Sequence, residues 1–172
     1  IAFLKQVATE TLDYVLREMT DAAGGFYSAT DADSEGREGV FFVWSMDELL
    51  SVLTEDEFKV AVEIFGVSEH GNFEGENILF LPDAYVDYAG ASGLELNALL
   101  EDVAAIKQKL LDVRNKRIPP LRDDKIITAW NGMMIMAFSH AGKLLGRKDY
   151  SDAAANAASY LLDKNLQDDG SL

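Results

Sequence analysis

Three polar segments of the chain carry residue types that acid–base or carbohydrate chemistry uses. The first is the acidic run Asp31-Ala32-Asp33-Ser34-Glu35-Gly36. Its alternating oxygen groups resemble the first half of a calcium-binding loop, which needs a Glu at its twelfth position. That position is Phe42, so an EF-hand is excluded. Calcium bound with a distant ligand, a solvated hairpin loop and a rim of carboxylates at a substrate cleft all stay open.

The second segment, Arg122-Asp123-Asp124-Lys125, precedes Trp130-Asn131-Gly132. One interpretation is structural, because Asp123 or Asp124 could cap a helix that begins near Lys125. The other is functional. Carboxylates bind sugar hydroxyls, an indole stacks on the apolar face of a pyranose, and a lysine keeps a neighbouring carboxylate ionised.

The third segment, Asn72-Phe73-Glu74-Gly75-Glu76-Asn77, places a candidate general acid or base, Glu74, between two amide side chains. Ordinary loop polarity explains it equally well. From the three segments we predict catalytic roles for Glu74, Asp123, Asp124 and Lys125. We predict substrate-binding roles for Asp31, Asp33, Glu35, Asn72, Asn77, Trp130 and Asn131.

Composition excludes several classes of function. The chain has 172 residues, with no Cys and two His, which leaves no thiolate chemistry and little basis for a zinc site. We predict no metal and no cofactor. A net charge of −15 opposes binding to nucleic acid or to an anionic membrane. No apolar run reaches the ~20 residues of a spanning helix and no signal peptide is visible, so we expect a cytoplasmic protein.

Hydrophobic periodicity indicates the elements that would position these segments. Capping boxes at Ser45/Glu48 and Thr54/Glu57 indicate two helix starts. Longer helices are predicted over residues 1–20, 94–117, 125–145 and 150–166. We predict a β-hairpin between 26–30 and 40–44, a short strand within 77–81, and a connector over 82–93.

A helix followed by an acidic glycine turn occurs twice in the sequence. Asp13-Tyr14-Val15-Leu16 precedes Gly24-Gly25-Phe26, and Ser159-Tyr160-Leu161-Leu162 precedes Gly170-Ser171-Leu172. The two segments align without gaps at an offset of 146 residues, from Asp13 to Ser159. Repeated helical hairpins of this kind stack into rings or solenoids.

Three ordered sets of residues also resemble a known family. They are 24–29 with 31–36 and Phe42-Val43-Trp44, then 71–75 with Asn77-Ile78-Leu79, then Asp123-Asp124-Lys125 with 129–132. Together they resemble the YyaL-type family, which includes spermatogenesis-associated protein 20. The resemblance extends over nearly the whole chain.

The resemblance implies a two-part protein, in which a thioredoxin-like domain precedes an (α/α)6 toroid similar to N-acylglucosamine 2-epimerases and six-hairpin glycosidases. Residues 1–172 would be a middle fragment of that toroid, mainly α with short β-hairpin insertions. The thioredoxin-like domain would be a partner in the same parent chain. Because an incomplete ring exposes inner helix faces, we expect the fragment to self-associate.

The fold of that family implies a carbohydrate ligand, with either epimerisation or hydrolysis as the reaction. The alternative is a non-catalytic binding or scaffold module that serves the thioredoxin-like domain. One departure is local: the resemblance implies a His, Gly or similar residue ahead of Asp123, where this chain has Pro120-Leu121-Arg122. A catalytic His at that position would be missing here.

Overall fold

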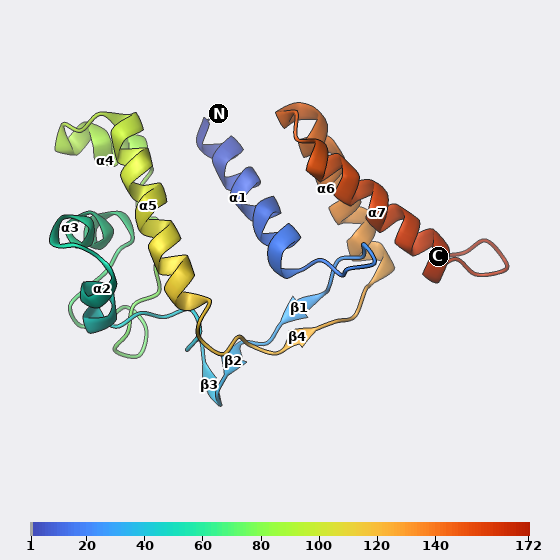
Figure 1. The fold of residues 1–172 in the computed structure, drawn as a ribbon, viewed down its shortest axis with the longest axis horizontal. Helices are drawn as coiled ribbons and strands as arrows, with labels where there is room; N and C mark the ends of the chain where they lie inside the picture. Colours follow the sequence, from blue (N-terminus) through green and yellow to red (C-terminus); the bar gives the residue numbers. More distant parts are fainter. Residues whose placement is uncertain (1) are drawn as a thin grey trace. The chain divides into compact units, whose positions relative to one another are not determined.

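The structure is a computed structural model that describes residues 2–172. Its helices are α1 (Ala2–Glu18), α2 (Met46–Val52), α3 (Glu55–Ile64), α4 (Tyr85–Ser92), α5 (Leu96–Arg114), α6 (Thr128–Leu145) and α7 (Lys148–Lys164). Its strands are β1 (Ala29–Thr30), β2 (Asp33–Ser34), β3 (Arg37–Glu38) and β4 (Arg122–Asp123). The prediction of a mainly α fold with short hairpin insertions is therefore confirmed (Figure 1).

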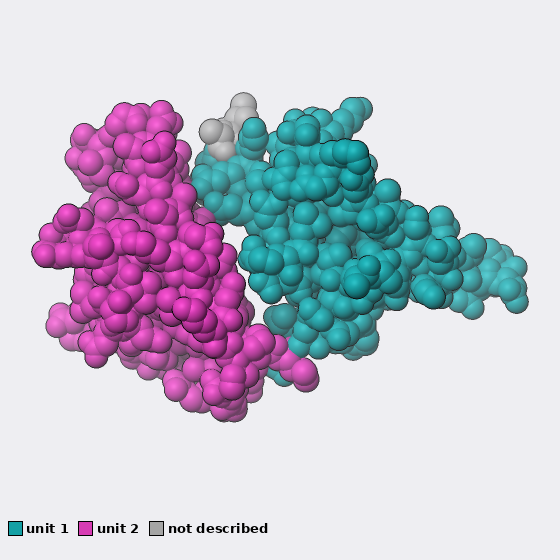
Figure 2. Space-filling view, viewed as in Figure 1, with its two compact units in different colours: residues 1–31, 122–172 teal, residues 32–121 magenta. Residues whose placement is uncertain are grey.

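The chain divides into two compact units (Figure 2). Unit 1 consists of Ile1–Asp31 and Arg122–Leu172, and unit 2 consists of Ala32–Leu121. The two segments of unit 1 meet in an antiparallel pair of strands, where β1 lies beside β4 with Ala29 opposite Asp123. Unit 2 has its own pair, β2 and β3.

The core of unit 1 lies between α1, α6 and α7. Helices α6 and α7 form an antiparallel hairpin, because Gly146 ends α6 in the left-handed conformation. The two helices approach closely at Gly142, where a Cβ atom would lie 2.9 Å from the backbone N of Ser151. The rings of Phe26 and Phe138 stack at 5.1 Å inside this core. Its buried members are Leu12, Val15, Phe26, Phe138, Tyr150, Ala153, Ala154 and Ala157.

The sequence repeat is also a structural repeat. Helices α1 and α7 both have 17 residues, and their bounds differ by the same 146 positions. In the first turn Asp21 N–H donates to Gly25 O at 2.8 Å, and in the second Gln167 N–H donates to Ser171 O at 2.8 Å. The bonds Gly24 N to Asp21 O and Gly170 N to Gln167 O, both 2.9 Å, correspond in the same way. The turns therefore share one backbone conformation.

Unit 2 packs α2, α3 and α4 against α5. The two predicted capping boxes are confirmed: Ser45 and Glu48 cap α2, and Thr54 and Glu57 cap α3. The core of this unit is apolar, with these buried members: Trp44, Leu49, Leu53, Ala61, Ile64, Phe65, Val67, Tyr85, Ala89, Leu99, Val103, Ile106 and Leu110.

Three local predictions were wrong. Residues 26–30 do not pair with 40–44, because β1 pairs with the distant β4 and the acidic run closes on itself as β2 and β3. That hairpin is tight because Glu35 and Gly36, at φ 55° and 75°, occupy the central positions of its turn. Residues 77–81 form no strand, only a single bridge between Asn77 and Trp44. The predicted connector contains α4, which Gly93 ends.

No helix of the described part of the chain has the length and apolar character needed to cross a bilayer.

Candidate functional site

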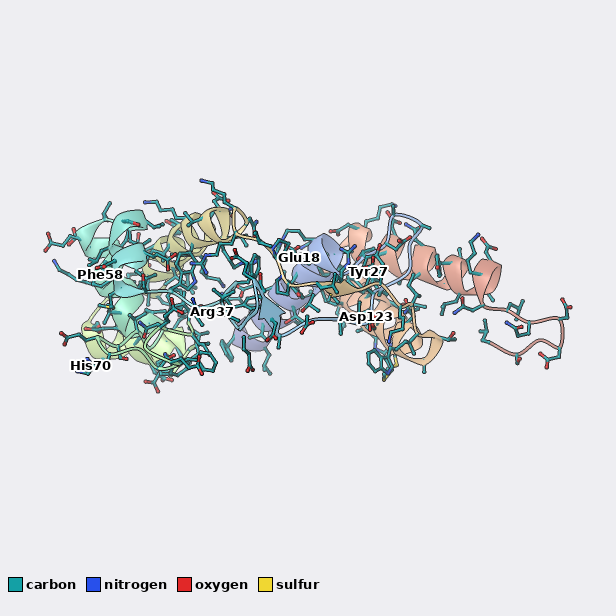
Figure 3. The ribbon with its side chains drawn as sticks, turned by 90° about the horizontal axis from the view of Figure 1, so that it is seen from below. Glu18, Tyr27, Arg37, Phe58, His70 and Asp123 are labelled. Atoms are coloured by element: carbon teal, nitrogen blue, oxygen red, sulfur yellow. The ribbon has the colours of Figure 1, made fainter. Side chains whose placement is uncertain are left out.

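The second polar segment, which begins at Arg122, meets the segment 24–30 in unit 1, on the ribbon formed by β1 and β4. The side chain of Ser28 donates to the carbonyl of Asp123 at 3.1 Å, just before β1 begins. This contact and the strand pairing place the acidic residues that follow Arg122 beside the segment 24–30. Glu18, Tyr27 and Asp123 are marked in this region in Figure 3.

Arg122 is the centre of a polar cluster that the sequence analysis did not identify. Its guanidinium lies 3.9 Å from the centre of the Tyr27 ring, its Nε donates to Asp124 Oδ1 at 2.6 Å, and one Nη donates to Glu18 O at 3.1 Å. The Tyr27 hydroxyl donates to Asp21 Oδ2 at 2.6 Å. Arg122, Tyr27, Asp124 and Asp21 are called the Arg122 cluster below. The only signal for it in the sequence was the position of Arg122 next to the Asp pair.

Hydrogen bonds fix the charges in and beside this cluster. The bond from Tyr27 lowers the pKa of Asp21, and the same bond raises the pKa of Tyr27. The bond from Lys125 lowers the pKa of the Asp123 carboxyl, and Lys125 Nζ lies 3.1 Å from Asp123 Oδ2. Asp21 and Asp123 are therefore carboxylates at neutral pH. They can accept hydrogen bonds or take up a proton, but they have none to donate.

Neither Asp caps a helix, so the structural interpretation of Asp123 and Asp124 was wrong. Helix α6 begins at Thr128, with Ile127 at the N-cap and no side-chain capping bond. Asp123 Oδ1 instead accepts from the backbone N of Lys125 at 3.3 Å, inside the preceding turn. The pair lies ahead of the helix because β4 holds Arg122 and Asp123 extended. The two side chains instead form ion pairs at the surface, Asp124 with Arg122 and Asp123 with Lys125.

Trp130 and Asn131 lie in the first turn of α6 and differ in environment. Trp130 is 51% exposed. Asn131 is buried, and its amide bonds both backbone groups of Phe26: Oδ1 accepts from Phe26 N at 2.7 Å and Nδ2 donates to Phe26 O at 2.9 Å. Asn131 can therefore act on a ligand only by positioning the segment around Phe26.

In unit 2, the predicted amide side chains also bond to backbone. Asn77 is buried, accepts from Ser68 N at 2.8 Å and donates to Ser68 O at 3.1 Å. Asn72 accepts from Ile78 N at 2.8 Å and donates to the carbonyls of Gly66 and Ile78. Both residues hold the loop that carries Glu74.

The predicted acidic residues of unit 2 lie on two tight hairpins. Asp33 is in β2, and Glu35 occupies the turn that follows it. Glu74 is exposed at the tip of a second turn, with φ 48°, between the bridged residues Phe73 and Glu76. The Arg37–Glu76 ion pair, at 3.2 Å, joins the two hairpins. Asp31 belongs to unit 1, where it is exposed after β1.

A second polar surface of unit 1 adjoins the turn that carries Asp21. It is a hollow of about 360 Å³ between this turn and α7. Its lining residues are Ala22, Ala23, Gly24, Asn156, Ser159, Tyr160, Asp163 and Lys164. Among the residues that the structure describes, no three His, Cys, Asp or Glu side chains are grouped so as to hold a metal ion.

Comparison with known proteins identifies relatives of this chain. No family model matches it. It is 30% identical to spermatogenesis-associated protein 20 of Rattus norvegicus and 29% identical to that of Homo sapiens, each over 92% of this chain. It is 27% identical to uncharacterized protein B0495.5 of Caenorhabditis elegans, over 98% of this chain. The chain is thus homologous to spermatogenesis-associated protein 20, and it spans 23% of the length of the rat and human proteins.

Proposed function

We propose that this chain is part of a carbohydrate-active domain of the spermatogenesis-associated protein 20 family, and that the surface around the Arg122 cluster binds sugar. The observation that carries the proposal is the position of Arg122, held between the Tyr27 ring and the Asp124 carboxylate. Contacts on both sides fix this guanidinium before any ligand arrives, which reduces the ordering cost of binding.

Polar and aromatic groups of unit 1 match the two sides of a pyranose. Asp123 and Asp124 supply acceptors for hydroxyl groups, and Lys125, with a 73% exposed side chain, supplies donors. Trp130 presents an exposed indole that can cover the apolar face of a ring. In the hollow beside α7, Asn156, Ser159 and Tyr160 add further hydroxyl and amide groups. Sugar recognition uses this mixture of acceptors, donors and one aromatic plane.

Both candidate reactions use an ionised carboxylate. A hydrolase uses one as nucleophile or base beside a second, protonated carboxyl, and an epimerase uses one as the base beside a carbonyl. The lowered pKa of Asp123 keeps its carboxyl ionised at neutral pH, which suits the ionised role in either reaction. We therefore place Asp123 or Asp124 in the role of base, with Lys125 orienting the carboxylate. Glu74 is the alternative candidate for this same role.

Saturation-transfer NMR of the 172-residue chain with a panel of mono- and disaccharides tests the proposal. The wild type should show transfer to at least one sugar, and Asp124→Asn and Trp130→Ala should each remove it. Glu101→Gln, an exposed change on α5, is the matched control and should keep it. The same samples in D₂O report exchange of the proton beside a carbonyl. Absence of transfer to every sugar contradicts the proposal.

A second candidate function is a non-catalytic scaffold that serves a thioredoxin-like domain. It is favoured by the amide side chains of Asn72, Asn77 and Asn131, which hold loops rather than reach outward. The test is calorimetric titration of this chain with the isolated thioredoxin-like domain of a full-length relative. Binding of that domain, without transfer to any saccharide, would establish the scaffold in place of the sugar-binding function.

A further inference from the structure

The structural repeat allows the surroundings of α1 and α7 to be compared position by position. At the offset of 146, Leu4 corresponds to Tyr150 and Val7 to Ala153. Ala8 and Thr11 correspond in the same way to Ala154 and Ala157. These four positions of each helix recur at spacings of three and four, so they form one face. Leu4, Val7, Ala8 and Thr11 are called the open face of α1.

The two faces have opposite exposure. On α7, Tyr150 and Ala157 are both 0% exposed, and Ala153 and Ala154 are buried as well. On α1, Leu4 is 69% and Val7 43% exposed, and Ala8 and Thr11 are also exposed. Further along the two helices, the exposure matches at Val15 and its counterpart Leu161, because both side chains are buried. The open face of α1 thus lacks the cover that its counterpart on α7 has.

Helix α6 supplies that cover for α7. The Phe138 ring meets the Tyr150 ring edge to face at 5.5 Å. Gly142 lets the two helices approach at Ser151, whose counterpart on α1 is Lys5. We infer that the open face of α1 is a docking surface for an antiparallel apolar helix of the α6 type, with an aromatic residue against Leu4 and a small residue against Lys5.

The other end of the repeat points to the same kind of helix. Phe26 is buried, because α6 contributes Phe138 to stack on its ring and Asn131 to bond its backbone. Its counterpart Leu172 is 57% exposed. Each copy of the repeated helix and turn thus has places for α6-type helices, and α6 occupies only those on α7 and Phe26.

A second copy of the chain does not offer this helix. The face of α6 that fits such a surface carries Phe138 and Gly142, and both are buried in their own unit. The occupant is therefore a partner helix with the chemistry of α6, which is apolar and carries an aromatic residue and a glycine four positions apart, as Phe138 and Gly142 are.

The test adds such a helix to the chain. A copy of residues 126–146 is fused directly ahead of residue 1, which puts residue 1 in the place that Arg147 has between α6 and α7. Hydrogen exchange of the α1 amides is then followed by NMR. Covering Leu4 and Val7 should slow that exchange about tenfold or more, because burial of each apolar side chain stabilises the helix.

Two variants make the result specific. Gly142→Leu in the added copy alone prevents the close approach and leaves the original α6 and α7 intact. Val7→Asp places a charge in the open face. Each should return α1 exchange to the rate of the unextended chain. The inference is overturned if the fusion leaves the α1 exchange unchanged, or slows it equally in either variant. It is overturned in favour of a second copy if the unextended chain sediments as a dimer that Val7→Asp dissociates.

Discussion

Asn131 and Phe26, 105 positions apart in the sequence, are joined by two hydrogen bonds in the core of unit 1, at 2.7 and 2.9 Å. The side-chain amide occupies both backbone groups of Phe26, as a neighbouring strand would. Asn77 does the same to Ser68 in unit 2. Two residues for which substrate binding was predicted thus hold the path of the backbone.

Asn131→Ala should lower the free energy of unfolding by about 3 kcal/mol, because it leaves the buried N–H and C=O of Phe26 without partners. Urea denaturation followed by circular dichroism measures the change. The control is Asn97→Ala, since Asn97 bonds only the exposed carboxylate of Glu95, and a change below about 0.5 kcal/mol is expected there. Equal losses in the two variants would refute the positioning role.

Gly71→Ala and Gly36→Ala form a matched pair, because both glycines have φ +75° but differ in the space around them. A Cβ at Gly36 meets nothing within 4 Å, so only the left-handed backbone opposes Ala there, at about 1–2 kcal/mol. At Gly71 a Cβ would lie 2.5 Å from the backbone N and O of Glu76. The steric overlap should add about 1–3 kcal/mol. Thermal unfolding measures both variants, and a Gly71 variant no less stable than the Gly36 variant would contradict the geometry.

Arg117 should be intolerant of lysine. Its guanidinium lies 4.2 Å from the centre of the Trp44 ring and donates to the carbonyls of Val40, Phe41 and Val43. A lysine has no plane to stack on the Trp44 ring and no second nitrogen for the Glu48 carboxylate, to which Arg117 Nη2 donates at 3.2 Å. Arg117→Lys should therefore cost about 2–4 kcal/mol of unfolding free energy in urea.

The control for Arg117 is Arg37→Lys, because Arg37 makes a solvent-exposed ion pair with Glu76. Such pairs contribute roughly 0–1 kcal/mol, so this variant should unfold close to the wild type. An Arg117→Lys variant as stable as the Arg37→Lys variant would show that the carbonyl contacts contribute little.

Tyr150 should titrate far above an ordinary tyrosine. Burial, and then its 2.7 Å hydrogen bond to Asp13 Oδ1, raise the pKa of its phenol to about 12. The phenol is thus harder to ionise in the folded state than in the unfolded chain. Its contribution to stability is complete below about pH 10 and is lost as the pH rises through about 12.

Absorbance at the tyrosinate band measures this titration. Tyr150→Phe should remove the step near pH 12 and flatten the alkaline loss of stability. Asp13→Asn should lower the pKa of Tyr150 only in part, because burial, the larger cause, remains. A titration curve that is the same in the wild type and Tyr150→Phe would disprove the assignment.

Local signals in the sequence predicted the helices well. The capping boxes at Ser45 and Thr54 were confirmed residue for residue, because a cap is formed within four positions of the chain. The repeat at offset 146 was confirmed in its backbone bonds for the same reason. Helix α4 was missed because no side chain caps it and Pro82 precedes it closely.

Contacts between distant segments could not be predicted in this way. Residues 29–30 have a strand-like composition, but the partner that pairs with them is Arg122–Asp123 rather than the next apolar run. The Arg122 cluster depends on that pairing, so Arg122, Tyr27 and Asp21 did not stand out in the sequence. Asn131 and Asn77 were recognised as special, but only their burial distinguishes a bond to backbone from a bond to ligand.

The pairing of β1 with β4 also has a consequence for how the chain can change. Residues 32–121 leave from Thr30 and return at Arg122, and these two residues are opposite each other in the ladder. Unit 2 is thus inserted into unit 1 between two residues that are adjacent in space. Domain insertion is tolerated in this arrangement. A two-residue Asn-Gly turn could close the same ladder. Unit 2 can therefore be exchanged, lengthened or removed while unit 1 keeps Arg122 beside Tyr27.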